Sequence, residues 1–457
     1  MKKRGYILLV ITSFAFAAFT KASNGDMPVA IPAGEQKMGD AAKGYEYLTT
    51  GDFLKSGLPY DVFIMARGER NNNLLHRTGK NATVEYGYNV VSNKDSIDIV
   101  IPTCLHCHAE LFAGKLVMGL GNASTDFSNI NAQNKNLSML KMLRLTAPKK
   151  YKAVEAFIRS VNTIDPYIET EARGVNPADK LAAVLVAHRN PQTLKWSSKA
   201  LIEIPQEVIP TDVPAWWLLK KKNAMFYTGF GRGDFSKFLM MSNLLTVSDS
   251  AEAREVSSHF SDVLAYIYSI KPPLYEGHIN EAQAQEGKVV FNNNCSRCHG
   301  TYGEGGYYPN LLIPGSIIGT DSMLYLANQQ NPQFIEWFNK SWFAMEPNPA
   351  KLAPFNGYIA PPLDGVWITA PYFHNGSVPT IEAVLNSKLR PAFWTRSFSN
   401  TDYDYSHLGW KYKSFPAADG KKSYNTTLPG YGNYGHYFGD ALNNKERDAV
   451  IEYLKTL

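Results

Sequence analysis

Residues 294–300 read Asn294-Cys295-Ser296-Arg297-Cys298-His299-Gly300, and the interpretation of the whole chain starts from them. Two cysteines three positions apart, followed directly by a histidine, form the attachment signature of c-type haem. Each thiol can form a thioether with one haem vinyl group, and the histidine can then bind the iron. A second copy, Cys104-Leu105-His106-Cys107-His108, stands earlier, and the two motifs contain all 4 cysteines. We therefore predict two covalently bound haem c groups, held by Cys104, Cys107, Cys295 and Cys298, with His108 and His299 as iron ligands.

Other uses of paired cysteines fit less well. A Cys-x-x-Cys pair can also be half of a zinc site or a thioredoxin-like redox pair. A zinc site would need both pairs to meet in one cluster, and a redox pair would follow a strand at the start of a helix. Neither alternative accounts for a histidine directly after both pairs.

The composition is that of a globular protein with more than one domain. The 457 residues are enough for two or three domains. With 19% charged residues and a net charge of +5, the chain lacks the basic runs of a nucleic-acid binder. Its 26 Tyr, 23 Phe and 8 Trp are many for this length, and such rings line haem faces or fill an aromatic core.

The first 22 residues have the features of an export signal. Lys2, Lys3 and Arg4 precede a short apolar run over residues 6–19, and small residues follow near position 22. The apolar run is too short to span a membrane, because a spanning helix needs about 20 residues. Since haem is attached to this motif outside the cytoplasm, we predict a periplasmic protein with no membrane segment after signal removal.

The apolar periodicity predicts a mainly α fold with little sheet. Helices are expected at 137–145, 150–160, 178–187, 235–245, 251–270, 282–291 and 444–457, and a short strand at 96–101. Lys271-Pro272-Pro273 marks the best boundary. We therefore expect two class I cytochrome c-like haem domains with long loops: an N-terminal one at 23–272 with insertions, and a C-terminal one at 273–457.

The sixth iron ligand decides between electron transfer and chemistry on an oxidant. Apart from the two proximal histidines, His374 and His436 stand out because they lie in glycine-bearing, aromatic segments rather than on helix faces. Both are candidates for haem contacts, as an iron ligand or as a propionate partner.

These segments resemble the bacterial diheme cytochrome c peroxidase superfamily, and within it the rubber-oxygenase-like branch. The resemblance extends loosely over residues 40–457. It is specific at the two haem motifs and at Tyr372-Phe373-His374-Asn375-Gly376-Ser377, and it is supported by residues 361–363, 214–220, 226–229 and 435–439.

The resemblance implies roles for individual residues. His374 would lie near the interface between the haems, contacting a propionate in the catalytic machinery. His436 would be the sixth ligand of haem 2, opposite His299, with Met345 as the competing thioether. Haem 1, on His108, would be the reactive centre, and a calcium ion could lie between the domains.

Two functions remain open at this point. In the first, a small redox protein or a quinol-linked donor supplies electrons to haem 2, and haem 1 reduces peroxide or activates oxygen. In the second, both irons have six ligands, with His76 a candidate to cap haem 1, and the protein only carries electrons. Trp216, Trp217 and Trp367 could relay electrons between the haems or simply fill the core. Glu110 is close to haem 1 in sequence but is expected to face the wrong side, so no distal acid is assigned.

Overall fold

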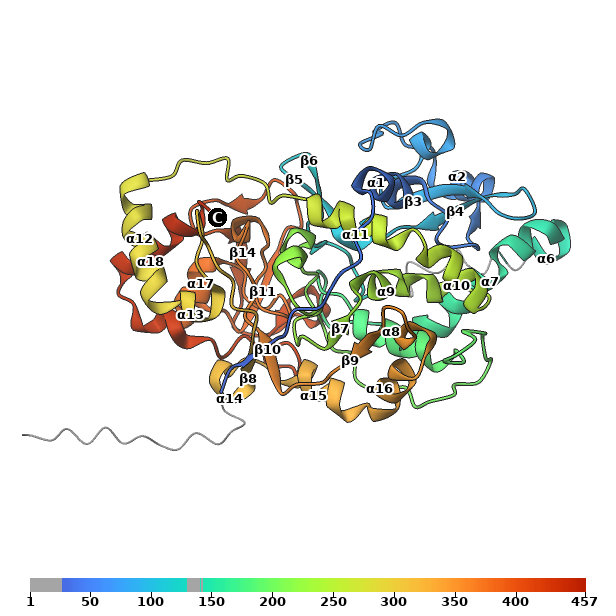
Figure 1. The fold of residues 1–457 in the computed structure, drawn as a ribbon. Coiled ribbons are helices and arrows are strands. Elements are labelled where there is room, and N and C mark those ends of the chain that lie inside the picture. Colours follow the sequence, from blue (N-terminus) through green and yellow to red (C-terminus); the bar gives the residue numbers. More distant parts are fainter. Residues whose placement is uncertain (1–26, 130–139, 141–142) are drawn as a thin grey trace, which may run out of the picture.

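Figure 1 shows the computed structural model of the chain, which describes residues 27–129, 140 and 143–457. The predicted signal peptide at 1–22 lies outside the described residues, and so does most of the predicted helix at 137–145. Helices account for 40% and strands for 13% of the residues, and the described strands form only two- and three-stranded sheets. The prediction of a mainly α fold is therefore confirmed, with some small sheets, whereas the division into two haem domains stays a prediction.

The helices of the described residues are α1 (Ala41–Thr50), α2 (Tyr60–Arg67), α3 (Leu105–His108), α6 (Leu143–Thr146), α7 (Pro148–Ile164), α8 (Ala178–Ala187), α9 (Phe235–Leu239), α10 (Ser250–Ser257), α11 (Phe260–Ser269), α12 (Glu281–Asn294), α13 (Ser296–His299), α14 (Gly315–Ile318), α15 (Met323–Gln330), α16 (Pro332–Asn339), α17 (Ile381–Leu385) and α18 (Asn444–Leu454). The strands are β1 (Val29–Ala30), β2 (Leu58–Pro59), β3 (Tyr88–Ser92), β4 (Asp98–Pro102), β5 (Ala109–Phe112), β6 (Lys115–Met118), β7 (Gly231–Gly233), β8 (Leu311–Pro314), β9 (Ala350–Leu352), β10 (Gly357–Ile359), β11 (Phe393–Arg396), β12 (Tyr403–Asp404), β13 (Gly409–Trp410), β14 (Tyr412–Ser414) and β15 (Tyr424–Asn425).

Several predicted elements are confirmed, and two need correction. Helix α8 has the predicted bounds, while α7 and α12 are longer than predicted. The expected single helix at 251–270 is two helices, α10 and α11, which are separated at Ser258 and His259. The apolar positions keep their helical spacing across this break, which is why periodicity alone predicted one helix. The expected helix at 235–245 continues beyond α9 as a 3-10 helix.

Each haem motif is accompanied by a pair of crossed helices. Helix α1 packs across α11, and α12 packs across α18. Both crossings have a glycine at the point of contact. A Cβ atom on Gly44 would lie 1.9 Å from the carbonyl oxygen of Asp262, and one on Gly287 would lie 1.8 Å from that of Ala449. Only glycine permits such an approach, so the two crossings share the same sequence requirement.

The α12–α18 pair is also capped by local hydrogen bonds. The Asn280 side chain accepts from the backbone N–H of Gln283 at the start of α12. At the start of α18, Asn443 and Glu446 form a reciprocal capping box. Such caps satisfy backbone donors that a helix start leaves free, so these residues fix where the two helices begin.

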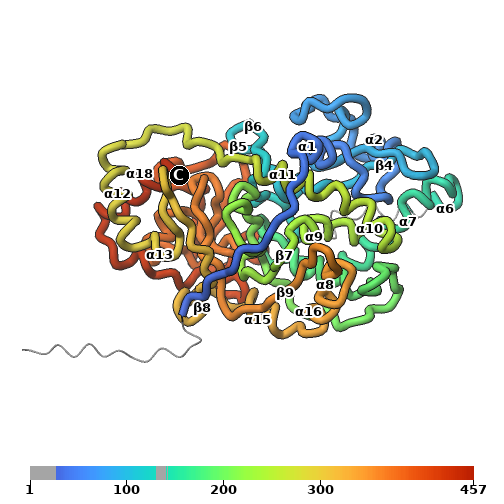
Figure 2. Tube along the Cα trace, viewed as in Figure 1, coloured from blue at the N-terminus to red at the C-terminus, as the bar shows by residue number. Residues whose placement is uncertain are grey.

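The two sequence units exchange segments across the predicted boundary at Pro272. The core around α11 includes Trp337, Phe338 and Trp342, which follow the second haem motif in the chain. Conversely, Phe112 and Trp217 belong to the core around α18. Two sheets also join the units, because β1 pairs with β8 and β7 pairs with β9. Figure 2 shows the N-terminal segment, in blue, running from β8 across the molecule to α1.

Candidate haem sites

Both haem motifs form a single helical turn with the same hydrogen bonds. In α3, the backbone N–H groups of Cys107 and His108 donate to the carbonyl of Cys104, at 3.2 and 2.9 Å. In α13, those of Cys298 and His299 donate to the carbonyl of Cys295, at 3.2 and 3.0 Å. None of the four thiols is in a disulfide. Burial raises the pKa of Cys104 and of Cys295 to about 11. One turn thus presents two free sulfurs side by side, as attachment to two vinyl groups requires.

A cavity of about 430 Å³ opens beside the first motif. Its wall includes Cys107 and His108 and is otherwise built largely from apolar and aromatic side chains. This volume is within the range of about 300–1,000 Å³ that is usual for ligand and cofactor sites. The residues of the wall are spread along the chain between Cys107 and Leu352. Its aromatic members are Trp216, Phe226, Tyr227, Phe230, Phe238, Phe334 and Phe338.

The ring of His108 is held by a tryptophan. Its imidazole stacks on Trp216, with 4.7 Å between ring centres and 19° between the planes. Its Nδ1 is buried and lies near the carbonyl of Pro214 without a hydrogen bond of normal geometry. Burial lowers the pKa of His108 to about 4, so the ring is neutral at pH 7. A neutral, oriented imidazole at the edge of a cofactor-sized cavity fits an iron ligand.

His299 has the tautomer that iron binding needs. Its Nδ1 lies 2.8 Å from the carbonyl oxygen of Pro361. A carbonyl only accepts hydrogen bonds, so Nδ1 carries the proton and Nε2 keeps its lone pair. The Tyr302 hydroxyl reinforces this arrangement, because it donates to the carbonyl of His299 and accepts from the N–H of Leu363.

The ring of His436 lies 6.1 Å from that of His299, centre to centre, at an angle of 63°. The two rings are close enough that His299 and His436 could both serve as ligands of one haem iron. The Nδ1 of His436 is buried without a partner in the described chain. Burial lowers the pKa of His436 to about 3. Its backbone is left-handed, with φ 49°, a strained conformation that often marks functional residues.

Met345, the competing ligand, has different neighbours. Its side chain is 45% exposed, and its carbonyl accepts a hydrogen bond from Lys237 of α9 at 2.7 Å. Helix α16 and strand β9, which flank it in the chain, lie to the right of α13 in Figure 1, beyond α14 and α15. The structure thus brings His436, rather than Met345, to His299.

His374 is buried in a hydrogen-bonded network. Its Nε2 lies 3.0 Å from the Tyr358 hydroxyl, which donates to the carbonyl of Asp321. The backbone carbonyl of His374 accepts from the N–H of Asp212, a residue in the cavity wall. Burial lowers the pKa of His374 to about 3, so the ring stays neutral.

Sequence reasoning missed the polar groups and thioethers of the cavity wall. Asp212 is half-buried in the cavity wall, and desolvation there raises its pKa to about 8, while the Tyr227 hydroxyl donates to its carboxyl group at 2.6 Å. Burial also raises the pKa of Asp179 to about 6 and lowers that of Lys222 to about 8. Met225 and Met241 line the cavity as well. The chain brings these residues together only by folding, and no local motif marks them.

Two other residues near haem 1 in sequence lie elsewhere. His76 is exposed and is not part of the described cavity wall. Glu110 is buried away from the cavity and accepts hydrogen bonds from the N–H of Ala123 and from the Ser124 hydroxyl. No group of three or more His, Cys, Asp or Glu suited to a metal ion occurs within residues 27–129, 140 and 143–457, so calcium stays a prediction. In the same ranges, no helix has the length and apolar character needed to cross a membrane.

The C-terminal unit is similar to known cytochrome c domains. A family model described as "Cytochrome c" matches residues 284–349, which include the second haem motif. Another, described as "RoxA-like, cytochrome c-like", matches residues 357–395, which include Pro361 and His374. These matches support a c-type cytochrome oxidoreductase with covalently bound haem c and a rubber-oxygenase-like relationship. Membership of the wider peroxidase superfamily stays a prediction.

Two proteins of Sinorhizobium fredii are also similar to the chain. The uncharacterized protein y4iJ is 42% identical over 111 residues, which is 22% of this chain and 18% of the relative. The uncharacterized protein y4iM is 25% identical over 313 residues, which is 59% of this chain and 69% of the relative. The similarity to y4iM extends over most of the chain at low identity.

Proposed function

We propose that this chain is a periplasmic diheme c-type cytochrome oxidoreductase. Electrons enter at haem 2, on Cys295 and Cys298, and peroxide or dioxygen reacts at haem 1, on Cys104 and Cys107. The observation that carries the proposal is the difference between the two sites. His299 faces a second histidine, whereas His108 borders a cavity of about 430 Å³ whose described wall contains no other histidine. Two strong axial ligands favour electron transfer, and an open position favours reaction with an oxidant.

Haem bound at Cys295 and Cys298 would supply one-electron transfer, and haem bound at Cys104 and Cys107 would supply reduction of the oxidant. The protein would contribute the axial groups. His299 is kept in the required tautomer by Pro361, and His436, whose ring lies 6.1 Å from that of His299, would be the second iron-binding residue. The imidazole ring of His108 is held in its orientation by stacking on Trp216. These contacts are the outer partners that orient an iron-binding imidazole.

A continuous path of groups connects the two proximal histidines. Trp216, stacked on His108, precedes Trp217 in the chain, and the Trp217 indole N–H donates to the carbonyl of Asp364 at 2.8 Å. Three residues before Asp364, the carbonyl of Pro361 accepts from His299. Trp217 is 1% exposed, so this side chain of the path is shielded from water. Stacked, covalent and hydrogen-bonded links of this kind suit electron transfer between the two sites.

Proton delivery at haem 1 falls to the acidic groups of the cavity. Asp179 and Asp212 line it, and burial raises the pKa of each toward neutrality, which is the range useful for a general acid or base. His374 acts as a positioning residue in this scheme. Its carbonyl holds the backbone of Asp212, and its ring is fixed by Tyr358.

One observation favours the second function, a pure electron carrier. The thioethers of Met225 and Met241 lie in the cavity wall, and either could be the sixth ligand of haem 1. In that case both irons would have two protein ligands. His76 does not contribute to this alternative, because it is exposed.

Spectra of the exported protein distinguish the two functions. Mass spectrometry should first show two attached haem groups. The oxidised or half-reduced protein should then give one high-spin signal, and peroxide or dioxygen should change that signal alone. Two low-spin haems in every redox state would exclude the oxidoreductase proposal and leave the carrier. One attached haem, or none, would exclude both.

The external partners follow from the same scheme. A small redox protein or a quinol-linked donor would reduce haem 2, and the oxidant would be a small molecule that fits the cavity. The calcium ion implied by the resemblance is part of the proposal, to be tested by metal analysis of the purified protein.

A further inference from the structure

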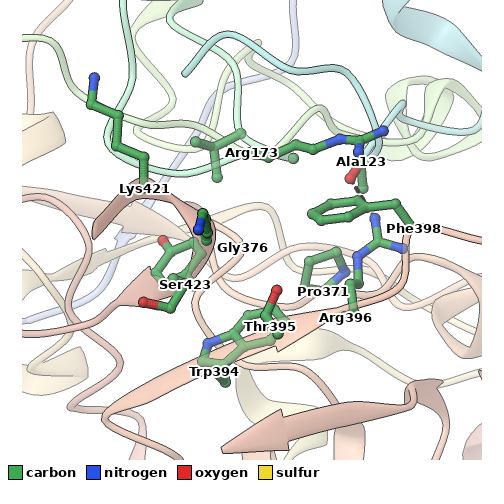
Figure 3. A pocket seen from close by; sticks show the side chains of 14 residues that line it. Ala123, Arg173, Pro371, Gly376, Trp394, Thr395, Arg396, Phe398, Lys421 and Ser423 are labelled. Atoms are coloured by element: carbon green, nitrogen blue, oxygen red, sulfur yellow. Dashed lines mark hydrogen bonds between the residues drawn. The ribbon is translucent and has the colours of Figure 1, made fainter. Parts of the chain in front are cut away.

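A small hollow at the seam between the two units is lined by cationic side chains. Figure 3 shows this hollow, which is distinct from the haem 1 cavity and shares none of its lining residues. Arg173 comes from the N-terminal unit, and Arg396, Lys421 and Lys422 come from the C-terminal unit. No Asp or Glu belongs to its described lining. Four cations without a lining carboxylate make the hollow a site of positive potential.

Arg396 is the central group. Its side chain is 8% exposed, and its Nη2 donates to the carbonyl of Ala123. Its Nε and Nη1 donate to no residue within 27–129, 140 and 143–457. The guanidinium lies against the rings of Phe398 and Trp410, at 4.4 and 4.2 Å from their centres. Neither nitrogen is among the fully buried polar atoms that lack a partner in the described chain, so both remain accessible from the hollow, where an acceptor can reach them.

Phe398 forms a platform between two guanidinium groups. Arg173 lies 4.1 Å from its ring centre on one side and Arg396 lies 4.4 Å away on the other (Figure 3). The backbone of Phe398 is left-handed, with φ 58°, which is a strained conformation for a bulky residue. The ring thus holds two like charges close together at a conformational cost.

The neighbouring charges leave part of this potential unbalanced. Lys421 is paired with Glu169 at 2.7 Å and with Glu171 at 3.7 Å. The buried Glu110 lies close enough to influence Arg396 and Arg173, but it forms an ion pair with neither and bonds to Ala123 and Ser124 instead. Lys422 is exposed and forms no ion pair with a residue of the described chain. Burial lowers the pKa of Arg396 to about 10, consistent with a charge that lacks a close partner.

We propose that this hollow binds the carboxylate group of a small organic acid, which bridges Arg173 of one unit to Arg396 and Lys422 of the other. The room is about 20 Å³, and a single water needs about 10–15 Å³ on this scale, so only one small group enters. A planar carboxylate matches the fork of a guanidinium and can accept two parallel hydrogen bonds. The remainder of the acid would extend into solvent. This proposal does not depend on the haem assignments.

The test uses the purified holoprotein and sodium acetate as the probe, at constant ionic strength maintained with sodium chloride. Acetate should bind at one saturable site by calorimetry and should raise the melting temperature with concentration, because ligands that bind the folded state stabilise it. Arg173→Gln and Lys422→Gln should each weaken binding about tenfold or more, the loss of a charge-assisted hydrogen bond. The matched control is Lys413→Gln. Lys413 is exposed on β14, pairs with Thr395 of β11, and is not part of the hollow.

Four outcomes would overturn the proposal. The first is no saturable binding of acetate to the wild type. The second is an equal loss of binding in the Lys413→Gln control, which would indicate a general effect of charge. The third is tighter binding of inorganic phosphate than of acetate, which would assign the hollow to phosphate groups. A glutamate-terminated peptide that binds much more tightly than acetate would assign the carboxylate to a partner protein rather than to a small acid, and would equally overturn the proposal.

Discussion

Trp217 donates its indole N–H to the carbonyl of Asp364 at 2.8 Å, and this bond joins the segment beside His108 to the segment beside His299. The two acceptors at the far end, the carbonyls of Asp364 and Pro361, are three residues apart. The structure therefore couples the orientation of one predicted iron ligand to that of the other through a single buried side chain.

Trp217→Phe should slow electron transfer between the haems about tenfold or more while leaving both haems attached. The substitution would keep a six-membered aromatic ring at this position, but the hydrogen bond from the indole N–H to the carbonyl of Asp364 would be lost. The rate can be measured by following both haems after rapid reduction of the protein. Trp410→Phe is the matched control, because Trp410 is also buried and donates to a carbonyl, that of Ala370, but lies outside the path. Equal rates in the two variants would exclude the path through Trp217.

His436→Ala should convert one low-spin haem to a high-spin haem, since it removes the proposed sixth ligand of haem 2. Met345→Leu should leave the spectrum unchanged, because this methionine is 45% exposed beside α9. Electron paramagnetic resonance of the oxidised protein checks both. If Met345→Leu produced the high-spin signal instead, the assignment of His436 would be wrong.

Asp212 should make folding stability fall as the pH rises through the neutral range. Burial raises its pKa to about 8 in the folded protein, whereas an unfolded aspartate has a pKa near 3.9. Between about pH 4 and pH 8 the unfolded chain has released the proton that the folded protein retains, so the unfolded state is increasingly favoured. Above about pH 8 both forms are ionised and this contribution levels off.

The test is urea unfolding at several pH values in the wild type and in Asp212→Asn. The variant cannot ionise at this position, so it should lose less stability between pH 5 and pH 8, by the order of a few kcal/mol. Asp419→Asn, at an exposed position, serves as the control and should follow the wild type. The prediction would be wrong if the free energy of unfolding of the wild type rose between pH 5 and pH 8 in parallel with that of Asp212→Asn.

Gly287→Ala should destabilise the protein by about 3 kcal/mol or more, because the added Cβ would lie 1.8 Å from the carbonyl oxygen of Ala449 and would force α12 and α18 apart. Gly44→Ala should have a similar effect on α1 and α11. Urea midpoints measure both. Gly34→Ala is the control, since its nearest neighbour would be 3.9 Å away. Unchanged urea midpoints in Gly287→Ala and Gly44→Ala would mean that the helices do not approach each other as closely as described.

The haem motifs and several helices could be predicted from the sequence because their determinants are local. One turn of helix contains each Cys-x-x-Cys-His motif, and α8 has its apolar residues at helical spacing within its own ten residues. The break between α10 and α11 could not be predicted in this way. The apolar face continues through it, and His259 at the break stacks on Tyr47, a residue more than two hundred positions away.

The remainder of the site could not be predicted because it forms only by long-range folding. Asp212, Met225 and Met241 line one cavity together with Leu352, although no spacing rule connects them. His436 was a candidate from its segment and from the family resemblance, but its approach to His299 depends on how residues 435–439 pack against the rest of the C-terminal unit. The cationic hollow combines Arg173 with Arg396, which the sequence gives no reason to place together.

The exchange of segments between the units sets an order of assembly for this chain. Trp337, Phe338 and Trp342 complete the core that surrounds the first haem motif, yet they are synthesised after the second. A growing or translocating chain that has exposed Cys104–His108 therefore still lacks part of the wall of its own cavity. Attachment of the first haem would take place on a loose, accessible polypeptide, and closure of its pocket would wait for the final third of the protein to emerge.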